Sequence, residues 1–253
     1  MGTEETSTKE PLASARARSE VPEQLAGAVG ACHPLQALLM GVAVAAAAYV
    51  SGRPLRETLV AGAAILVVQA ALGLLNDAAD AERDRAAGVA GKPVAEGHLP
   101  PGNASFLGVC LMVMAVPLAL ENGTAAAVAL LGYLLAGLLS LTPLRRSWLS
   151  WLPWAAGFAL LPAYLAYGGW GLGVHGSPPT WTMTVLAAAL GVGVHLLLAL
   201  PHLVADNRNG MRHLPLRIAL RTGASRLLVA ATIWTGLCAV ALVLAAFAVG
   251  LRQ

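Results

Sequence analysis

Long apolar stretches separated by short polar segments make up most of this chain. Crossing a bilayer takes about 20 residues, and about seven stretches are long enough to cross it or nearly so. They cover residues 35–51, 57–76, 104–121, 124–142, 148–167, 180–201 and 227–250. Because backbone groups in lipid find no water to bond, such stretches are expected to be α-helices. The pattern predicts an all-α, polytopic transmembrane helix bundle.

Composition agrees with this fold class. Of the 253 residues, 57% are hydrophobic and 11% charged, and the mean hydropathy is +0.69. Soluble domains carry about 25% charged residues. Residues 1–25 are polar and mixed in charge and lack the apolar core of a signal peptide, so we expect a disordered cytoplasmic tail followed by a transmembrane domain over 26–253.

Basic residues predict the orientation. With the N-terminus in the cytoplasm, all of the 16 Lys and Arg residues lie on the cytoplasmic side except Arg53, Arg56 and Arg252. This asymmetry predicts a multi-pass protein of the inner (plasma) membrane with a cytoplasmic N-terminus and an external C-terminus. The net charge of +3 then reflects topology, and nucleic acid is not an expected partner.

The sequence LLNDAADAERDRAAG places an acidic motif at the cytoplasmic end of the second apolar stretch. Asp77, Asp80 and Asp84 fall on one face if the helix continues through them, and Asn76 precedes them. Carboxylates in such a line are costly unless a partner neutralises them. Mg²⁺ holding a substrate diphosphate is one partner that fits, and a solvated helix end is the alternative.

Basic candidates for phosphate binding follow in the cytoplasmic segments. Lys92 lies in the Gly- and Pro-rich loop after the acidic motif, and Arg145 and Arg146 lie between the fourth and fifth stretches. Arg208 and Arg212 follow the sixth stretch. Each is equally explained as an anchor of membrane topology.

A second polar group ends the sixth stretch. His195, His202 and Asp206 are spaced by 7 and 11 residues, which predicts a similar helical face, with Pro201 as a source of a kink. We interpret them as the opposite wall of one cavity; for His195 the alternative is a hydrogen bond to a neighbouring helix.

Three segments together resemble the UbiA-type intramembrane prenyltransferases. The family's first aspartate signature is similar to NDAADAERDRAAG with the downstream KPVAEGHLP. Its cytoplasmic loop and next helix are similar to TPLRRSWLSWLPWAAGFALLPAY, and its second aspartate signature to LPHLVADNRNGMRHLPLRIALRTG. The match runs in order from about His33 to Gly223.

The resemblance implies a helical bundle whose central cavity opens to cytoplasmic loops and binds a prenyl diphosphate through Mg²⁺. Carried over to this chain, it implies three sets of residues. The metal ligands are Asp77, Asp80, Asp84 and Asp206, and the catalytic residues are Asp77, Asp80 and His202. The substrate-binding residues are Asn76, Lys92, Arg145, Arg208, Arg212 and His195.

Two departures from the family pattern change these expectations. His202 stands where the second signature normally begins with Asp, and imidazole is a poor ligand for Mg²⁺. One metal ion is therefore expected to bind weakly, differently or not at all. Family members usually have about two further helices beyond the one that follows the second signature, whereas here only the stretch 227–250 follows it. We therefore expect part of the cavity wall to be missing or supplied by another subunit of a homo-oligomer.

We predict an enzyme that moves a prenyl group from a prenyl diphosphate to an aromatic or other lipophilic acceptor. Two alternatives stay open: a membrane terpene cyclase, and a non-catalytic protein that binds isoprenoid lipids. Prenyl chain length and acceptor identity cannot be read from the sequence, because they depend on which residues line the cavity.

Overall fold

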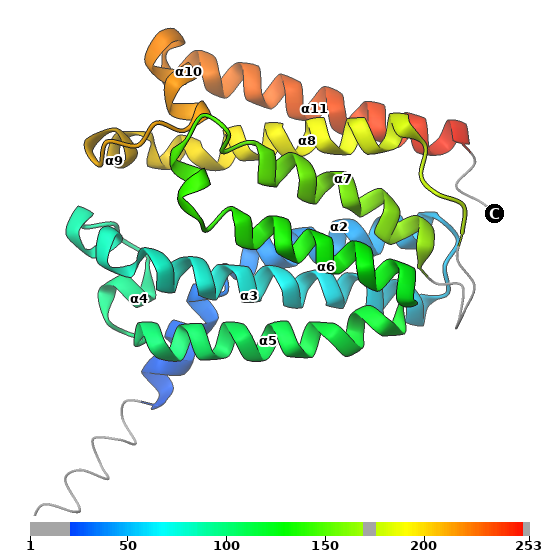
Figure 1. Ribbon diagram of the computed structural model, residues 1–253, viewed down its shortest axis with the longest axis horizontal. Helices are drawn as coiled ribbons and strands as arrows, with labels where there is room; N and C mark the ends of the chain where they lie inside the picture. The colour runs from blue at the N-terminus through cyan, green and yellow to red at the C-terminus, as the bar shows by residue number, and fades with distance from the viewer. Residues whose placement is uncertain (1–20, 169–175, 250–253) are drawn as a thin grey trace, which may run out of the picture. The chain divides into compact units, whose positions relative to one another are not determined.

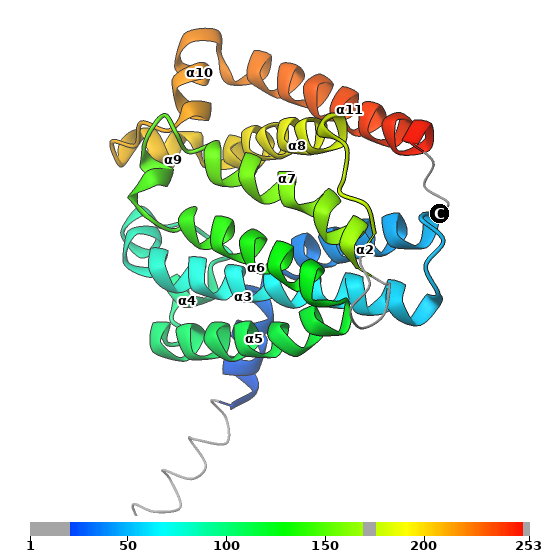
Figure 2. The ribbon, with the colours of Figure 1, turned by 45° about the vertical axis from the view of Figure 1, so that its right-hand side comes forward.

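The computed structural model describes residues 21–168 and 176–249, which form helices joined by short loops (Figures 1 and 2). A first helix, Val21–Ala31, precedes the labelled elements. These are α2 (Pro34–Val50), α3 (Leu55–Ala87), α4 (Pro93–Glu96), α5 (Pro101–Glu121), α6 (Thr124–Leu139), η1 (Pro143–Arg146), α7 (Leu152–Tyr167), α8 (Trp181–Ala199), η2 (Leu200–His202), α9 (Leu203–Arg208), α10 (Leu214–Thr222) and α11 (Ala224–Val249). Of the tail expected over 1–25, residues 1–20 lie outside the described residues and residues 21–25 are helical.

The described residues contain no strand, so the all-α prediction is confirmed, but the expected count of seven spans is not. Within these residues, four helices are long and apolar enough to cross a membrane. A fifth crossing results if Val21–Ala31 and Pro34–Val50, bent by 49° at their junction, count as one span. Helices α6 and α7 have 16 residues each. At 1.5 Å per residue they reach about 24 Å, less than the hydrocarbon thickness.

Helix α3 continues well beyond the predicted apolar stretch, which ended at residue 76. It has 33 residues and ends at Ala87. Gly88 follows with a φ of +62°, and the Val89 amide donates to the Asp84 carbonyl oxygen, an ending that favours glycine. All three carboxylates of the acidic motif therefore lie on helical backbone.

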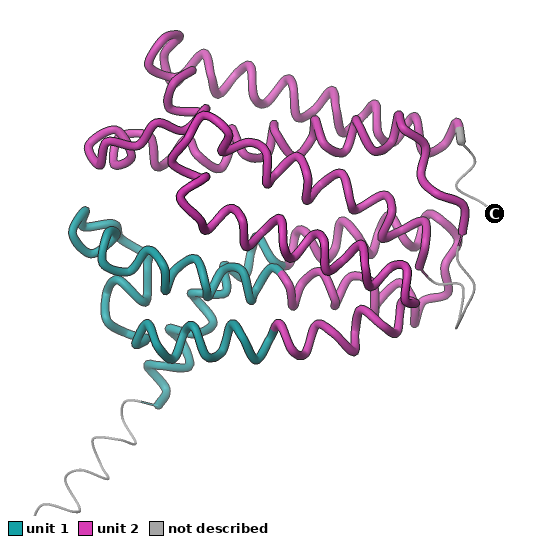
Figure 3. The backbone as a smooth tube through the Cα atoms, viewed as in Figure 1, with its two compact units in different colours: residues 1–37, 69–111 teal, residues 38–68, 112–253 magenta. Residues whose placement is uncertain are grey.

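The chain divides into two compact units, shown in different colours in Figure 3. Unit 1 comprises residues 1–37 and 69–111, and unit 2 comprises residues 38–68 and 112–253. In unit 1 the helix Val21–Ala31 packs with the second part of α3, α4 and the first part of α5. Its core consists of small and aliphatic side chains: Ala31, Leu74, Ala81, Val94, Leu99 and Ala104.

Unit 2 contains a row of helices in which α6 packs on α7, α7 on α8, and α8 on α11 (Figures 1 and 2). Glycines on α8 allow the close approach. A Cβ on Gly191 would lie 2.5 Å from the Trp154 carbonyl oxygen of α7, and Gly193 lies against Trp234 and Thr235 of α11. Small residues at such contacts are typical of helix packing in membranes.

Candidate functional site

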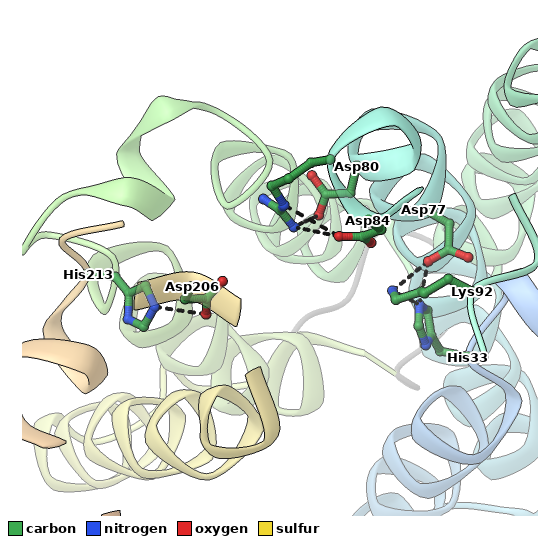
Figure 4. A network of polar contacts seen from close by, with 8 residues as sticks. His33, Asp77, Asp80, Asp84, Lys92, Asp206 and His213 are labelled. Atoms are coloured by element: carbon green, nitrogen blue, oxygen red, sulfur yellow. Dashed lines mark hydrogen bonds and ion pairs between the residues drawn. The ribbon is translucent and has the colours of Figure 1, made fainter. Parts of the chain in front are cut away.

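Asp77 carries two basic partners in unit 1. Its Oδ1 lies 2.6 Å from Lys92 Nζ and 3.2 Å from His33 Nε2 (Figure 4). The carboxylate is 2% exposed, and its Oδ2 is buried without a hydrogen-bond partner among the described residues. A buried carboxylate needs compensation of its charge, and Lys92 supplies it at Oδ1 while Oδ2 remains available.

His33 reaches Asp77 because the chain breaks between two helices. It ends the helix Val21–Ala31 with a φ of +49°, a left-handed conformation that His adopts more readily than most residues, and Pro34 begins α2. Gly73, one turn before Asp77, lets this break approach α3. A Cβ on Gly73 would lie 2.9 Å from the Ala31 carbonyl oxygen. The turn at His33 thus packs closely against α3.

The loop that carries Lys92 is fastened to the end of α3. Arg85 donates from Nε to the Ala95 carbonyl oxygen at 3.0 Å and from Nη2 to the Val94 carbonyl oxygen at 3.3 Å. Lys92 directly precedes α4, and Gly97 ends α4 in the left-handed conformation. These bonds fix the loop so that the Lys92 side chain, only 13% exposed, extends to Asp77.

Asp80 and Asp84 share a guanidinium on their own helix. Arg83 Nη2 lies 2.7 Å from Asp80 Oδ2 and 3.3 Å from Asp84 Oδ1. Asp80 is 4% exposed and Asp84 6% exposed. Within the described part of the chain, Arg83 Nη1 is buried and makes no hydrogen bond. Positive side chains thus contact each of the three carboxylates.

The residues of this acidic helix suit a hard divalent cation. No group of three or more His, Cys, Asp or Glu side chains is gathered as a metal site in residues 21–168 and 176–249. The donors are nevertheless carboxylate oxygens on successive turns of one helix, and Asp77 Oδ2 is buried and unbonded. Mg²⁺ prefers such oxygens and takes only one or two carboxylates along with substrate phosphates, so the chemistry of the donors fits it.

The second acidic position, Asp206 in unit 2, has a different kind of partner. Its Oδ2 lies 3.0 Å from His213 Nε2 (Figure 4). His213 is 4% exposed and precedes α10, and the Leu216 amide donates to His213 Nδ1 at 3.2 Å. A backbone amide can only donate, so Nδ1 is an acceptor and the proton is on Nε2. His213 is therefore a neutral imidazole that donates to Asp206.

A chain of hydrogen bonds ties this segment to α8. The Leu214 amide donates to Ser150 Oγ at 3.2 Å, and Ser150 Oγ lies 3.0 Å from His195 Nε2. The His195 ring stacks on Trp154, with 5.6 Å between the ring centroids. Ser150 and His195 are both buried. The segment is also held at the Arg212 amide, which donates to the Arg146 carbonyl oxygen at 3.0 Å.

The helix expected to carry His195, His202 and Asp206 is not regular throughout, and their placement on one helical face stays a prediction. Helix α8 ends at Ala199, η2 spans Leu200–His202, and α9 begins at Leu203. Pro201 has no N–H to donate, which accounts for the short 3₁₀ segment between α8 and α9. His195 is buried beside Ser150, which matches the interhelical alternative, while His202 is exposed.

Two histidines that sequence reasoning missed are partners of Asp77 and Asp206. His33 and His213 are 44 and 7 residues from Asp77 and Asp206, respectively. A His-Pro step at the start of an apolar stretch is a weak signal for His33. The signal for His213 is its place before Leu214 and Pro215, where a side-chain acceptor caps a helix.

The remaining candidates lie in various environments. Asn76 and Arg145 are half-buried, and Arg208 and Arg212 are exposed. Their roles toward a diphosphate, like the metal-binding roles of the four aspartates and the role of His202, stay predictions.

One protein family matches most of the chain. The model of the UbiA prenyltransferase family matches residues 37–252. The chain belongs to the UbiA prenyltransferase family. The resemblance drawn from the three motifs is therefore confirmed. A comparison with curated protein sequences yields no significant match.

Solved structures of UbiA proteins share the fold. One is a UbiA homolog from Archaeoglobus fulgidus bound to GPP and Mg²⁺, with a TM-score of 0.66 and 14% identity over 85% of this chain and 76% of that chain. The same homolog bound to DMAPP and Mg²⁺ gives a TM-score of 0.64 and 15% identity over 85% of this chain and 75% of that chain. A third structure concerns the biosynthesis of digeranylgeranylglyceryl phosphate synthase in membranes. It gives a TM-score of 0.58 and 17% identity over 86% of this chain and 78% of that chain.

Proposed function

We propose that this UbiA-family chain is a Mg²⁺-dependent membrane enzyme that transfers a prenyl group from a prenyl diphosphate to an aromatic or other lipophilic acceptor. The observation that carries the proposal is the set of Asp77, Asp80 and Asp84. They are nearly buried on one helix, and basic side chains contact each of them. The structures of a UbiA homolog with GPP or DMAPP and Mg²⁺ support the choice of donor and cation.

The reaction needs a group that stabilises the departing diphosphate. When the carbon–oxygen bond of an allylic diphosphate breaks, the electron pair leaves with the diphosphate and an allylic cation remains. A carbon or oxygen atom of the acceptor then bonds to that cation, and the acceptor loses a proton. In this proposal Asp77, Asp80, Asp84 and Asp206 are each ligands of Mg²⁺, and bound Mg²⁺ would supply positive charge for the leaving group.

Other residues of this chain contribute to charge balance and exclusion of water. Lys92 holds Asp77 in place and carries an ammonium at the edge of the acidic helix, where it can contact a phosphate oxygen. Arg145, Arg208 and Arg212 are further phosphate contacts in this proposal, and Asn76 orients the diphosphate. His202 bonds to the diphosphate or the acceptor. The apolar helices exclude water, which would otherwise capture the cation.

The proposal is tested with the full-length protein in detergent or membranes. It is incubated with C10–C20 prenyl diphosphates, Mg²⁺ and a panel of aromatic and lipid acceptors, and the products are identified by mass spectrometry. The matched pair of variants is Asp80→Asn and Glu82→Gln. Both remove one carboxylate charge from α3, but Glu82 is exposed. We expect the first variant to lose turnover and the second to keep it.

The products also separate the alternatives. Prenylated acceptor supports the transferase, whereas a cyclic hydrocarbon or alcohol formed without acceptor identifies a terpene cyclase. Binding of prenyl diphosphate and Mg²⁺ without any product identifies a non-catalytic isoprenoid-binding protein. A protein that binds neither ligand would contradict both enzyme hypotheses.

A further inference from the structure

Asp206 depends on a residue that lies beyond the aspartate motif itself. In the described structure its side chain bonds to His213, which reaches it from the start of α10. His202, the histidine that stands at the position of the missing acid, is exposed on η2. The geometry thus assigns the supporting role to a different histidine from the one that the motif suggests.

We propose that His213 is the positioning residue of the second aspartate motif: it fixes the orientation of the Asp206 carboxylate toward the metal–diphosphate ligand. This inference rests on the proposed function, because it assumes that Asp206 takes part in binding that ligand. It goes further in naming a residue outside the acidic positions that decides how well the altered motif works.

The ring of His213 is held from both sides. Nδ1 accepts from the Leu216 amide at 3.2 Å, and Nε2 donates to Asp206 Oδ2 at 3.0 Å. The first bond fixes the ring and its tautomer, so the second bond has a defined direction. An orienting group that is itself anchored to backbone is the usual support for a metal-binding side chain.

The backbone around this pair is anchored as well. The Met211 amide donates to the Asp206 carbonyl oxygen at 3.0 Å, which closes the turn between Asp206 and His213. The Leu214 amide donates to buried Ser150, which also bonds to His195. Because both ends of the Asp206–His213 pair are fixed, little side-chain ordering remains to be done when a ligand binds.

Two substitutions separate positioning from helix capping. In His213→Asn the amide oxygen takes the place of Nδ1 and keeps the bond to Leu216, but the donor to Asp206 is lost. In His213→Gln the amide nitrogen takes the place of Nε2 and keeps the donor, but the cap is lost. If His213 acts mainly as a cap, His213→Gln should bind the ligand more weakly than His213→Asn. If it acts mainly by positioning Asp206, His213→Asn should bind the ligand more weakly.

The experiment measures binding of Mn²⁺ with geranyl S-thiolodiphosphate, an unreactive analogue, to the full chain in detergent by electron paramagnetic resonance. We expect His213→Asn to weaken binding about 10- to 100-fold, the usual effect of losing such an orienting group, and to keep the melting temperature. His213→Gln should bind within about threefold of the unmodified protein and melt earlier, since it loses a cap. His98→Asn, a surface histidine paired with Glu23, is the control and should bind normally.

An Asp206→Asn background supplies the cross-check. There, adding His213→Asn should weaken binding no further, because the carboxylate that it positions is gone. Equal binding by His213→Asn and His213→Gln, the reverse order, or an additive loss in the Asp206→Asn background would each overturn the inference. If His213→Asn does not fold, His213→Ser, whose hydroxyl also caps α10, takes its place in the same comparison. If the unmodified protein does not bind the probe, the proposed function fails together with the inference.

Discussion

The two acidic motifs support their carboxylates in different ways. On α3, Asp77, Asp80 and Asp84 contact the cationic side chains of Lys92 and Arg83. In unit 2, Asp206 contacts a neutral imidazole that is anchored to backbone. The first motif has three carboxylates whose charges are compensated within the protein, and the second has one carboxylate that is oriented but not compensated.

This difference shows how a buried acidic site remains stable before its ligand arrives. Three carboxylates within about two turns would repel each other strongly in a low-dielectric environment, so built-in cations are required. A single half-buried carboxylate needs orientation more than compensation. Removal of a partner should therefore have opposite effects on cation binding in the two motifs.

The largest expected effect comes from the first motif itself. Asp80→Asn should lower turnover at least about 1000-fold, because it removes a carboxylate proposed to hold the charge that stabilises the leaving diphosphate. Turnover is measured by mass spectrometry at saturating Mg²⁺. Asp206→Asn should have a smaller effect, about 10- to 100-fold. If Asp206→Asn is the more damaging variant, the ranking of the two motifs is reversed.

The next effect concerns stability. Lys92→Met removes the ammonium from buried Asp77 and leaves His33 as its basic partner, and it should lower the free energy of unfolding by about 3 kcal/mol in the absence of Mg²⁺. The double variant Asp77→Asn/Lys92→Met should recover most of that loss, because no uncompensated charge remains. Thermal or denaturant unfolding in detergent measures both. Additive losses in the double variant would show that the ion pair is not what stabilises Asp77.

A third prediction compares the partners directly. Arg83→Met should tighten Mn²⁺ binding about tenfold, since a guanidinium 2.7 Å from Asp80 Oδ2 opposes a second cation. His213→Asn should weaken it, as argued above. The control is Arg217→Met, because Arg217 is exposed and donates from Nε to the Arg212 carbonyl oxygen. Weaker binding in Arg83→Met would show that Arg83 contributes to the bound state instead of competing with the cation.

The smallest effect is expected at Ser150. Ser150→Ala removes the acceptor of the Leu214 amide and the partner of His195, and should lower stability by about 1 to 2 kcal/mol. The loss should appear as a lower melting temperature with only a modest change in Mn²⁺ affinity, because the His213–Asp206 bond itself remains. A loss of affinity as large as that of His213→Asn would mean that the Ser150 bond controls Asp206 as well.

Much of the fold could be predicted because lipid permits few solutions. Apolar stretches must form helices, and each predicted stretch coincides with one. Their ends were less predictable. Helix α3 continues for 11 residues beyond Asn76, because Asp, Ala, Glu and Arg are acceptable helix formers until Gly88 ends it. Helix α6 ends at Leu139, three residues early, at the turn before Pro143.

The candidate site was predictable only where its parts are close in sequence. The spacing of Asp77, Asp80 and Asp84 follows from helical geometry alone. The prediction for His195, His202 and Asp206 applies the same rule across Pro201, where α8 gives way to the 3₁₀ segment η2, so it stays a prediction. Spacing arguments hold only while the backbone stays regular.

The sequence by itself determined the helical membrane architecture and the line of three carboxylates, because these depend on composition and local periodicity, and it indicated the family through the resemblance of three motifs. The tertiary structure decided which side chains accompany those carboxylates. His33 and Lys92 come to Asp77 through a helix break and a loop, and His213 comes to Asp206 through a closed turn. Such contacts depend on how the backbone folds back on itself, and no local pattern of residues encodes that.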